Sequence, residues 1–437
     1  MPACFGSSRD PSRLPVRSPS MKRVSPSLIL VLTLAGWIFQ PAMAAVFSCD
    51  QAVAQALTHN ADLDAARITV AEARGRLVQA GRLSNPEVEA AIRPHANGRE
   101  RVGEFGVTQR FPLTARLRLA KDVSRLELAA AEAEVADAER RLAGEVRTAV
   151  TQMLVLAARM DLRRRQQSNS VELAEFARRT AAAGEGPGID ALQFDLETSQ
   201  HAIRLKALEA EANMLRAKLR PLLGMADAEE LSFSGSLAEP QAAPPVPHPP
   251  ENRRPDQVAA AARTGAAQEA VRLARAGKWE DAGLGFFGEI DRNEDGPFGL
   301  QTDHRVGIRL SVPLPLWNRN RGRIDEASAT VRRVAMEAEA LDRRVRSEIA
   351  AADSEMRGAF ATLRGITDSL LPQARVIEDR IRNARAVGQA SFTDLLRARD
   401  RRLELESSRI DALAAYHLAA VRLQTAVGGV GQPPKTR

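Results

Sequence analysis

Tyrosine, cysteine and tryptophan are the rarest residues in this sequence. Only 4% of its 437 residues are aromatic, and Tyr416 is the single tyrosine, whereas 27% are charged. Such a composition favours extended amphipathic helices over a compact catalytic core. Of the two cysteines, Cys4 falls in the leader segment described below, which leaves Cys49 alone. A disulfide within the mature chain and a cysteine-based metal cluster are therefore excluded.

Sequence motifs for catalysis and metal binding are also missing. The sequence has no phosphate-binding loop, nucleophile elbow or zinc-binding helix motif. His304 beside Asp303 could touch passing cations, but a solvated loop position is the simpler interpretation. We therefore predict that the chain is not an enzyme and has no catalytic residues, no cofactor and no metal site. The histidines are dispersed without metal-ligand spacing: His59, His95, His201, His248, His304 and His417.

Long apolar runs are scarce, and the one near the N-terminus reads as a secretory signal peptide. A basic segment at residues 21–23 precedes an apolar run at residues 28–39, and Ala42-Met43-Ala44 is a small-residue cleavage pattern. The run is too short to remain as a membrane-spanning helix. The true start is Met1 or Met21. Removing residues 1–44 lowers the net charge from +7 to about +3, too little to indicate a nucleic-acid partner.

Cys49 lies close enough to the cleavage pattern to raise the alternative of lipid attachment. Against it, Val46-Phe47-Ser48 is a poor lipidation motif, because Phe47 is bulky, and the apolar run ends ten residues earlier. We expect ordinary cleavage, with lipidation of Cys49 as the less favoured alternative.

The mature sequence is an internal duplication. GVTQRFPL at residues 106–113 aligns without a gap on GIRLSVPL at residues 307–314, and GEGPGIDAL at 184–192 corresponds to GQASFTDLL at 388–396. Leu223-Gly224 likewise corresponds to Val427-Gly428.

A proline-rich stretch, PQAAPPVPHPPENRRP, separates the two copies and suits an extended linker. The predicted organisation is an N-terminal extension and signal peptide (1–44), a first repeat (45–239), the linker (240–255), a second repeat (256–430) and a C-terminal tail (431–437).

Each repeat changes from helical to strand periodicity and back again. In the first repeat, Glu87, Glu89 and Arg93 alternate with Val88 and Ile92; a second alternating run begins near residue 101. The second repeat shows the same pattern at residues 284–290 and 305–312. These patterns predict strands of about ten residues with one apolar face, the length and the alternation that a membrane-spanning barrel needs. Residues 96–99 and 293–299 would form the loops between paired strands.

After each strand pair the helical period continues for an unusual length. Residues 116–183 and 324–387 are each predicted to form one long helix, with apolar residues spaced by three and four as in coiled coils. Pro372 should kink the second helix because it removes a backbone donor. Each long helix ends at a glycine-rich break and is followed by a helix of about 35 residues, which predicts two helical hairpins with their turns at one end and the strands at the other.

Four strands cannot close a barrel, and an open sheet edge cannot lie in lipid. The chain must therefore oligomerise. Two copies would supply eight strands with a filled interior and three copies twelve strands with room for a passage. The pattern alone does not choose between these numbers.

At this level of detail the sequence resembles a known family. The order of signal peptide, QAVAQALTHNADL (51–63), strand pair, long helix, glycine break and LLGM (222–225) resembles the TolC-type outer-membrane factors, the outer membrane efflux protein family. SVPLPLWNRNRGRIDEASA (311–329) is similar to the heavy-metal branch of that family, the cobalt-zinc-cadmium exporters. RRPDQVAAAA, from Arg253, resembles the opening of the family's second half.

The resemblance implies a fold that is mainly α with β. The expected assembly is a homotrimer with a twelve-stranded β-barrel in the outer membrane and a helical barrel in the periplasm. It also implies two protein partners, a periplasmic adaptor and an inner-membrane RND transporter, and an efflux function with heavy-metal cations as the expected cargo. One departure is that few aromatic residues are available for the interfacial girdle: Phe105, Phe111, Phe286, Phe287 and Trp317.

The residues at the two helix turns are the candidate functional residues. Their basic role is to cap helices, and the additional hypothesis is that they form the periplasmic tip that docks the adaptor. Asp190 and Asp394 could place carboxylates at that aperture, although plain surface solvation is the stronger expectation. The tip residues are Gly184, Gly186, Pro187, Gly188, Asp190, Gly388, Ser391, Phe392, Asp394, Leu395 and Leu396.

Three other interpretations stay open. One is an efflux duct of the same family for drugs or other organic solutes. Another is a soluble periplasmic coiled-coil scaffold or the adaptor itself, although adaptors usually carry one helical hairpin rather than two. An enzyme is the third and has the least support, because no catalytic constellation is present.

Overall fold

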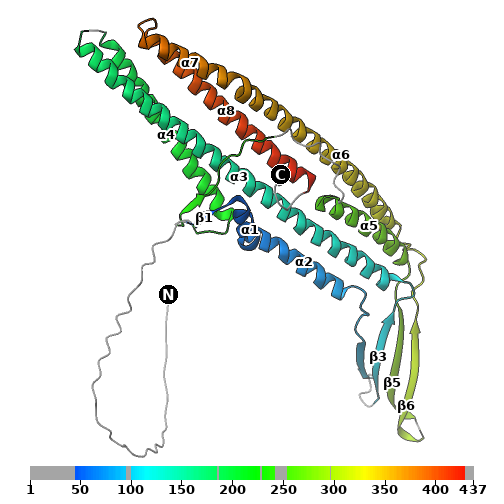
Figure 1. Cartoon of the computed structure of the whole chain (residues 1–437). Coiled ribbons are helices and arrows are strands. Elements are labelled where there is room, and N and C mark those ends of the chain that lie inside the picture. The colour runs from blue at the N-terminus through cyan, green and yellow to red at the C-terminus, as the bar shows by residue number, and fades with distance from the viewer. Residues whose placement is uncertain are drawn as a thin grey trace, which may run out of the picture. The chain divides into compact units, whose positions relative to one another are not determined.

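The computed structural model describes residues 45–94, 100–184, 187–226, 229–241, 253–295 and 297–428 (Figure 1). The predicted signal peptide, most of the predicted linker and the predicted C-terminal tail lie outside these residues. Ala44–Arg437 form one compact unit, to which the following description is confined.

The two repeats share a helix, a strand pair and a long helical hairpin in the same order, and the first repeat has one additional helix at its start. In the first repeat, two helices lead to a strand pair and then to a long helix and its partner: α1 (Cys49–His59), α2 (Ala61–Gln79), β2 (Glu87–Pro94), β3 (Arg101–Phe111), α3 (Arg116–Ala182) and α4 (Ile189–Leu222). In the second repeat the series is α5 (Pro255–Ala276), β5 (Ala282–Asp295), β6 (Gly299–Ser311), α6 (Arg321–Gly365), a π-helical turn η1 (Ile366–Leu370), α7 (Leu371–Ala386) and α8 (Phe392–Val427).

The four long strands form one antiparallel sheet in the order β2-β3-β5-β6. Directly paired residues share a face, so the register separates an apolar face from a charged one. Phe105 pairs with Gly288 on the apolar face, and Glu104 pairs with Glu289 on the charged face. The predicted alternation is therefore confirmed. The predicted loop at residues 293–299 is too long, because β5 continues to Asp295 and β6 begins at Gly299.

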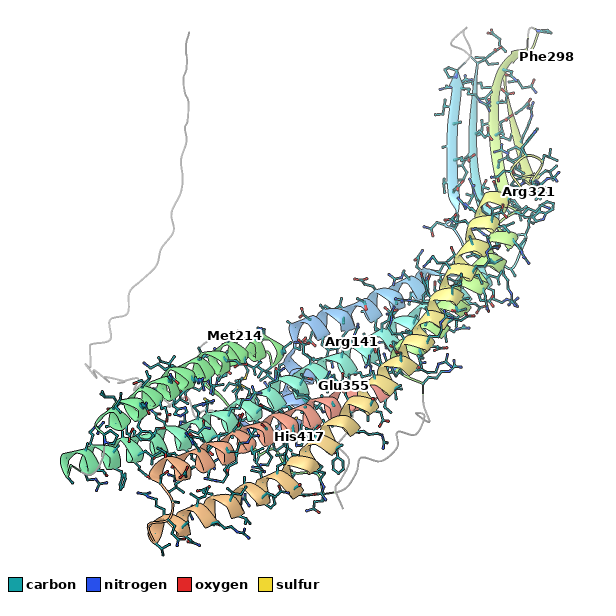
Figure 2. All side chains as sticks on the ribbon, turned by 90° about the horizontal axis from the view of Figure 1, so that it is seen from above. Arg141, Met214, Phe298, Arg321, Glu355 and His417 are labelled. Carbon is teal, nitrogen blue, oxygen red and sulfur yellow. The ribbon has the colours of Figure 1, made fainter. Side chains whose placement is uncertain are left out.

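The sheet lies at one end of the helices, and the turns of the two helical hairpins lie at the other (Figure 1). Figure 2 shows Phe298 at the far end of the β5–β6 hairpin and Arg321 where α6 starts beside the sheet. The main apolar core is formed between α1, α3 and the end of α4, and includes Val146, Val150 and Leu219. No helix of the described segments is both long and apolar enough to cross a membrane.

The first long helix has 67 residues, and its prediction is confirmed almost to the residue. The second begins at Arg321, three residues before its predicted start, and is interrupted by the π-helical turn. Pro372 is the reason, since it has no N–H to donate to the preceding turn. The Leu371 N–H instead donates to the carbonyl of Ile366, five residues back. The predicted disturbance is present, and it takes the form of a widened turn.

A joint occurs twice, where the end of one helical hairpin meets the start of α2 or of α5. Asn60, the N-cap of α2, donates from Nδ2 to the Leu222 carbonyl at the end of α4, 3.2 Å away. Arg254, the residue before α5, donates from Nη1 to the Ala426 carbonyl at the end of α8, also 3.2 Å away. Both contacts satisfy carbonyl groups that have no partner within their own helix. The joints therefore connect each hairpin to the helix that leads to the strands.

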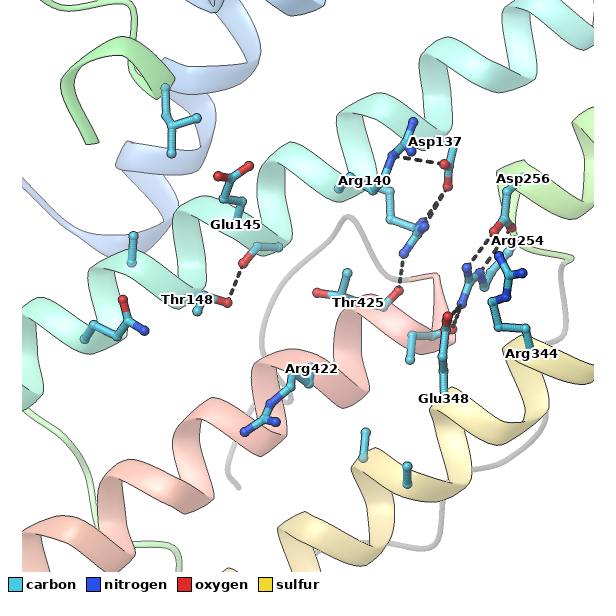
Figure 3. A pocket seen from close by; sticks show the side chains of 18 of the residues that line it. Asp137, Arg140, Glu145, Thr148, Arg254, Asp256, Arg344, Glu348, Arg422 and Thr425 are labelled. Atoms are coloured by element: carbon cyan, nitrogen blue, oxygen red, sulfur yellow. Dashed lines mark hydrogen bonds and ion pairs between the residues drawn. The ribbon is translucent and has the colours of Figure 1, made fainter. Parts of the chain in front are cut away.

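The second joint is built around two buried arginines (Figure 3). The guanidinium of Arg254 contacts Asp256 at 2.5 Å and Glu348 at 2.8 Å. Arg140 on α3 contacts Asp137 at 2.7 Å and donates to the Thr425 carbonyl at 2.7 Å. These groups line a cavity of about 1080 Å³ between α3, α5, α6 and α8. Because both arginines are paired with groups of the chain itself, we assign them a structural role.

Neither joint was predicted from the sequence, and the small parallel sheet of β1 (Ala45–Phe47) and β4 (Leu231–Phe233) was also missed. Strands of three residues are too short to produce a periodic signal.

Candidate functional site

The predicted tip residues lie at the two hairpin turns, at the end of the helices opposite to the sheet (Figure 1). Gly184 follows α3 with φ +74°, and Gly388 follows α7 with φ +75°. A Cβ at either position would meet no heavy atom within 4 Å. Glycine therefore meets the need for a left-handed backbone at these turns rather than a lack of space. Their predicted role as helix caps follows from this geometry.

The two turns differ in how the next helix begins. Gly188, after Pro187, is the N-cap of α4 and offers no side-chain oxygen. Ser391 begins α8 with a capping box: its Oγ accepts from the Asp394 N–H at 3.1 Å, and the Asp394 carboxylate accepts from the Ser391 N–H at 3.1 Å. The hydrogen bond from the Ser391 hydroxyl lowers the pKa of Asp394. Asp394 thus has a local structural partner besides any contact at an aperture.

Ser391→Ala should loosen the second turn without unfolding the chain. The substitution removes one capping bond, which costs about 1 kcal/mol of helix stability. Faster amide exchange is expected at residues 391–395 and unchanged exchange at residues 188–192. Gly188→Ala is the control, because α4 has no side-chain cap to lose. Equal exchange in the Ser391 variant and the wild type would contradict the assigned cap.

Some of the remaining predicted tip residues pack between the two hairpins, and the others lie at the surface. Leu396 packs against a cluster that contains Ala174 and Phe194 of the first hairpin, whereas Asp190 and Leu395 are half-buried. The guanidinium of Arg385 lies over the ring of Phe176 at 4.9 Å from its centre. The two hairpins therefore touch near their tips. Gly186 and the side chain of Phe392 lie outside the described part of the structure.

An exposed apolar stripe on α4 near its start was missed. Ile189, Leu192 and Leu196 are each more than half exposed and recur at helical spacing, so they lie along one side of α4. Val387, the C-cap residue directly after α7, is also exposed. The i, i+3, i+7 spacing could have been found in the sequence, but it does not distinguish an interaction surface from a buried face.

The charged face of the sheet carries six carboxylates and four arginines. Glu104 on β3 contacts Arg93 of β2 at 3.0 Å and Arg309 of β6 at 2.6 Å. Gly106, Gly285 and Gly307 have no side chains on this face, so the side chain of Arg309 can extend across the sheet. Its guanidinium carbon lies 5.1 Å from the centre of the Phe287 ring. The charged set is Glu87, Glu89, Arg93, Glu104, Arg110, Glu289, Asp291, Asp303, Arg305 and Arg309.

The opposite face exposes many large apolar side chains. Val306 is 91% exposed and Ile92 is 79% exposed, and Phe105, Phe286, Ile308 and Leu310 belong to the same face. Phe105, Phe111 and Phe286 fit the predicted aromatic girdle, as does Trp317, which is 93% exposed just after β6. Phe287 does not, because it lies on the charged face beneath Arg309. So large an exposed apolar surface marks an interaction with a membrane or with other proteins.

Two further predictions, on Cys49 and on metal ligands, involve residues away from the tip and the sheet. Cys49 is the first residue of α1 and packs half-buried against the main core, where burial raises the pKa of its thiol. Cleavage directly before Cys49 would remove β1, which pairs with β4. We therefore still expect ordinary cleavage upstream. Within the described ranges, no three His, Cys, Asp or Glu residues gather as metal ligands.

The chain is similar in sequence to one protein family and in fold to several solved outer-membrane channels. Residues 248–429 match the family described as outer membrane efflux protein. The outer-membrane channel OprN superposes with a TM-score of 0.71 at 21% identity, covering 87% of this chain and 90% of that one. VceC from Vibrio cholerae gives 0.68 at 18% identity, covering 87% and 96%, and CusC gives 0.68 at 17% identity, covering 94% and 99%. No curated protein matches the chain in sequence.

The predicted fold class is confirmed by these superpositions, which extend over both repeats. The description of the family that matches residues 248–429 agrees with the predicted location in the outer membrane and with the predicted efflux function. Residues 248–429 match this family in sequence, and both halves of the chain share the fold of the solved outer-membrane channels.

Proposed function

We propose that this chain is the outer-membrane exit channel of a tripartite efflux system and that it works as a homotrimer. The observation that carries the proposal is the four-stranded sheet with one exposed apolar face, one charged face and two unpaired edges, β2 and β6. In lipid, every backbone N–H and C=O on those edges needs a partner. Other copies of the same chain can supply it.

The strand directions suit such closure. Each strand is antiparallel to its neighbour, so β2 and β6, the first and the last of four, run in opposite directions. The β6 edge of one copy can therefore pair with the β2 edge of the next without breaking the antiparallel order. Three copies give twelve strands, whereas eight strands would leave an interior filled by side chains. The charged face would then line water and the apolar face would contact lipid.

The partners of the channel are proposed from the hairpin tips. An adaptor protein with its own helical hairpin could pack on the exposed stripe of Ile189, Leu192 and Leu196, beside the turn at Gly184. The second turn, around Gly388 and Ser391, would complete the docking surface. The inner-membrane transporter is expected to be of the RND type. It would supply the energy, since the channel itself is a passive duct.

For the cargo we propose heavy-metal cations. The support is the similarity of residues 311–329 to the heavy-metal branch, together with the excess of carboxylates over arginines on the charged face. Most of these charges are paired with each other, which suits weak contacts and fast release rather than tight binding. The alternative cargo is a drug or another organic solute.

Val306→Arg should prevent insertion into the outer membrane. Val306 lies near the middle of β6 on the apolar face, where an arginine facing the bilayer midplane costs about 2–4 kcal/mol per chain. The heat-modifiable oligomer in outer-membrane fractions should be lost. Gln301→Arg on the charged face is the matched control and should leave it intact. If both variants insert equally well, the apolar face does not contact lipid and the channel proposal fails.

The cargo is tested in a strain that lacks the gene and carries either an empty plasmid or the wild-type gene. Growth is compared across a series of cobalt, zinc and cadmium salts and a panel of organic antibiotics. Sensitivity to the metals alone, restored by the wild-type gene, is expected. Sensitivity to the antibiotics alone would replace the heavy-metal proposal by the drug-efflux alternative.

A further inference from the structure

Three arginines without a carboxylate partner surround a cavity between the two helical hairpins. Arg163 comes from α3, Arg204 from α4 and Arg399 from α8, and all three line a cavity of about 270 Å³. None of them has a carboxylate within ion-pairing distance among the described residues. Arginines on nearby turns differ in this respect, since Arg159 contacts Asp411 at 2.7 Å and Arg402 contacts Glu378 at 2.5 Å.

Two buried polar atoms at this cavity have no hydrogen-bond partner among the described residues. The Nε of Arg399 is buried and has no hydrogen-bond partner in the described part of the chain. Gln166, also in the lining, has a buried and unpartnered Oε1. Turning its amide by 180° would put the NH₂ group there as a further donor, because the two ends have the same shape. Buried polar atoms without partners are rare in native proteins and call for a missing ligand or water.

His201 adds to this set in its neutral form. Burial, Arg163 and Arg204 all lower its pKa, and its Nδ1 accepts from the Arg163 guanidinium at 3.2 Å. In that tautomer the Nε2 atom carries a hydrogen and is a donor. Burial and the neighbouring charge of Arg204 also lower the pKa of Arg163. Arg163 and Arg204 are therefore held close to each other at a cost that a bound anion would reduce.

Two carboxylates also line the cavity and do not fill this role. Glu404 is paired with Arg401 at 2.5 Å. Burial raises the pKa of Asp400, although Arg399 beside it acts in the opposite direction. Glu197 on α4 is close enough to Asp400 to be affected, and burial and Asp400 raise its pKa. Glu404 is thus paired outside the cavity and Asp400 lies close to Glu197, so neither forms an ion pair with the three arginines.

We propose that this cavity binds a tetrahedral oxyanion, sulfate or inorganic phosphate, and that the anion ties the first hairpin to α8. Arginine forks match the oxygens of such anions, and hydrogen bonds between charged groups are about twice as strong as neutral ones. The volume accommodates the anion together with several waters, at about 30 Å³ per water. Because α3 and α4 belong to one hairpin and α8 to the other, the bound anion resists their separation.

The test uses the purified mature protein in detergent, with thermal unfolding followed by circular dichroism. Sodium sulfate and sodium phosphate are titrated at low millimolar concentration against sodium chloride of equal ionic strength. Saturable stabilisation by the two oxyanions alone is expected. In Arg163→Gln and Arg399→Gln the apparent dissociation constant should rise at least about tenfold, the effect of losing one charge-assisted contact. Arg164→Gln, an exposed neighbour on α3, is the control and should behave as the wild type.

Two results would overturn the proposal. Equal, non-saturable shifts in all variants would mean that the anions act only as general stabilising salts. No shift in the wild type would mean that the arginines are already paired in the assembly, for example with carboxylates of a second copy. In that case Arg163→Gln would instead weaken the oligomer, which the mass in detergent would reveal.

Discussion

Gly224→Ala is expected to abolish folding of the mature protein. Gly224 ends α4 at the first joint with φ +65°, and an added Cβ would lie 2.1 Å from the backbone carbonyl oxygen of His59. Neither atom belongs to a flexible side chain, so α1 and α4 would have to move apart. The left-handed backbone adds about 1–2 kcal/mol and overpacking about 1–3 kcal/mol or more. We expect no heat-modifiable oligomer in the outer membrane and rapid proteolysis of the chain.

Two other glycines separate the steric effect from the backbone effect. Gly184→Ala and Gly388→Ala carry the same left-handed strain at φ +74° and +75° but meet nothing within 4 Å. They should fold and lose only about 1–2 kcal/mol locally. If Gly224→Ala is no worse than these two variants, the close approach at the first joint does not hold in solution.

Arg254→Met is expected to have the next largest effect. Arg254 is 5% exposed, and its removal leaves Asp256 and Glu348 without their cation and the end of α8 without a donor. Breaking a fully buried ion pair from one side costs about 3–5 kcal/mol, and the cost here should lie below that range because the Asp256 and Glu348 side chains are 18% and 44% exposed. Chemical denaturation of the detergent-solubilised protein measures the loss. Arg422→Met is the control: its pair with Glu355 is exposed on both sides, and the expected cost is about 0–1 kcal/mol.

The effect of Arg254→Met should also depend on pH. Burial alone would raise the pKa of Asp256, but the hydrogen bonds and the charge of Arg254 outweigh it, and the pKa is lowered from its ordinary value of 3.8. A carboxyl with a lowered pKa stabilises the folded state above its unfolded pKa, and this contribution is lost as the pH falls through the folded pKa. The difference between wild type and variant should therefore be constant near neutral pH and shrink below about pH 4. If the difference in unfolding free energy between wild type and variant does not change down to pH 2, Asp256 does not contribute to it.

The sequence predicted the features that produce a periodic or repeated pattern, namely the strand faces and the helix ends. Strand faces follow from period-two patterns such as Glu87 to Arg93, and the helix ends follow from Gly184 and Gly388, because only the chain's own neighbours decide these features. Phe287 was misassigned for the opposite reason. Its place in a run of apolar residues suggested the lipid side, whereas the register with Gly106 and Gly307 puts it on the charged face.

Features that join distant segments could not be predicted in this way. Asn60 meets Leu222, and Arg254 meets Glu348 and Ala426, across 94 to 172 residues of sequence. Arg163, Arg204 and Arg399 also come together only in the folded chain, and each alone looks like one more charge on a helix. The sequence predicted the helix ends at the tip, but only the structure shows that no described residue covers the apolar stripe beside them.

The two free edges of the sheet have a consequence for how this protein is made. A single chain that has folded its helices still carries unpaired backbone groups along β2 and β6 and an uncovered apolar face. Such edges invite pairing with any available strand, including those of unrelated chains. For the proposed trimeric channel, association must therefore precede or accompany entry into the bilayer, and the yield is expected to depend on the concentration of chains in the periplasm. At low chain concentration, single subunits should accumulate and be degraded. At high chain concentration, aggregation should compete with closure of the barrel.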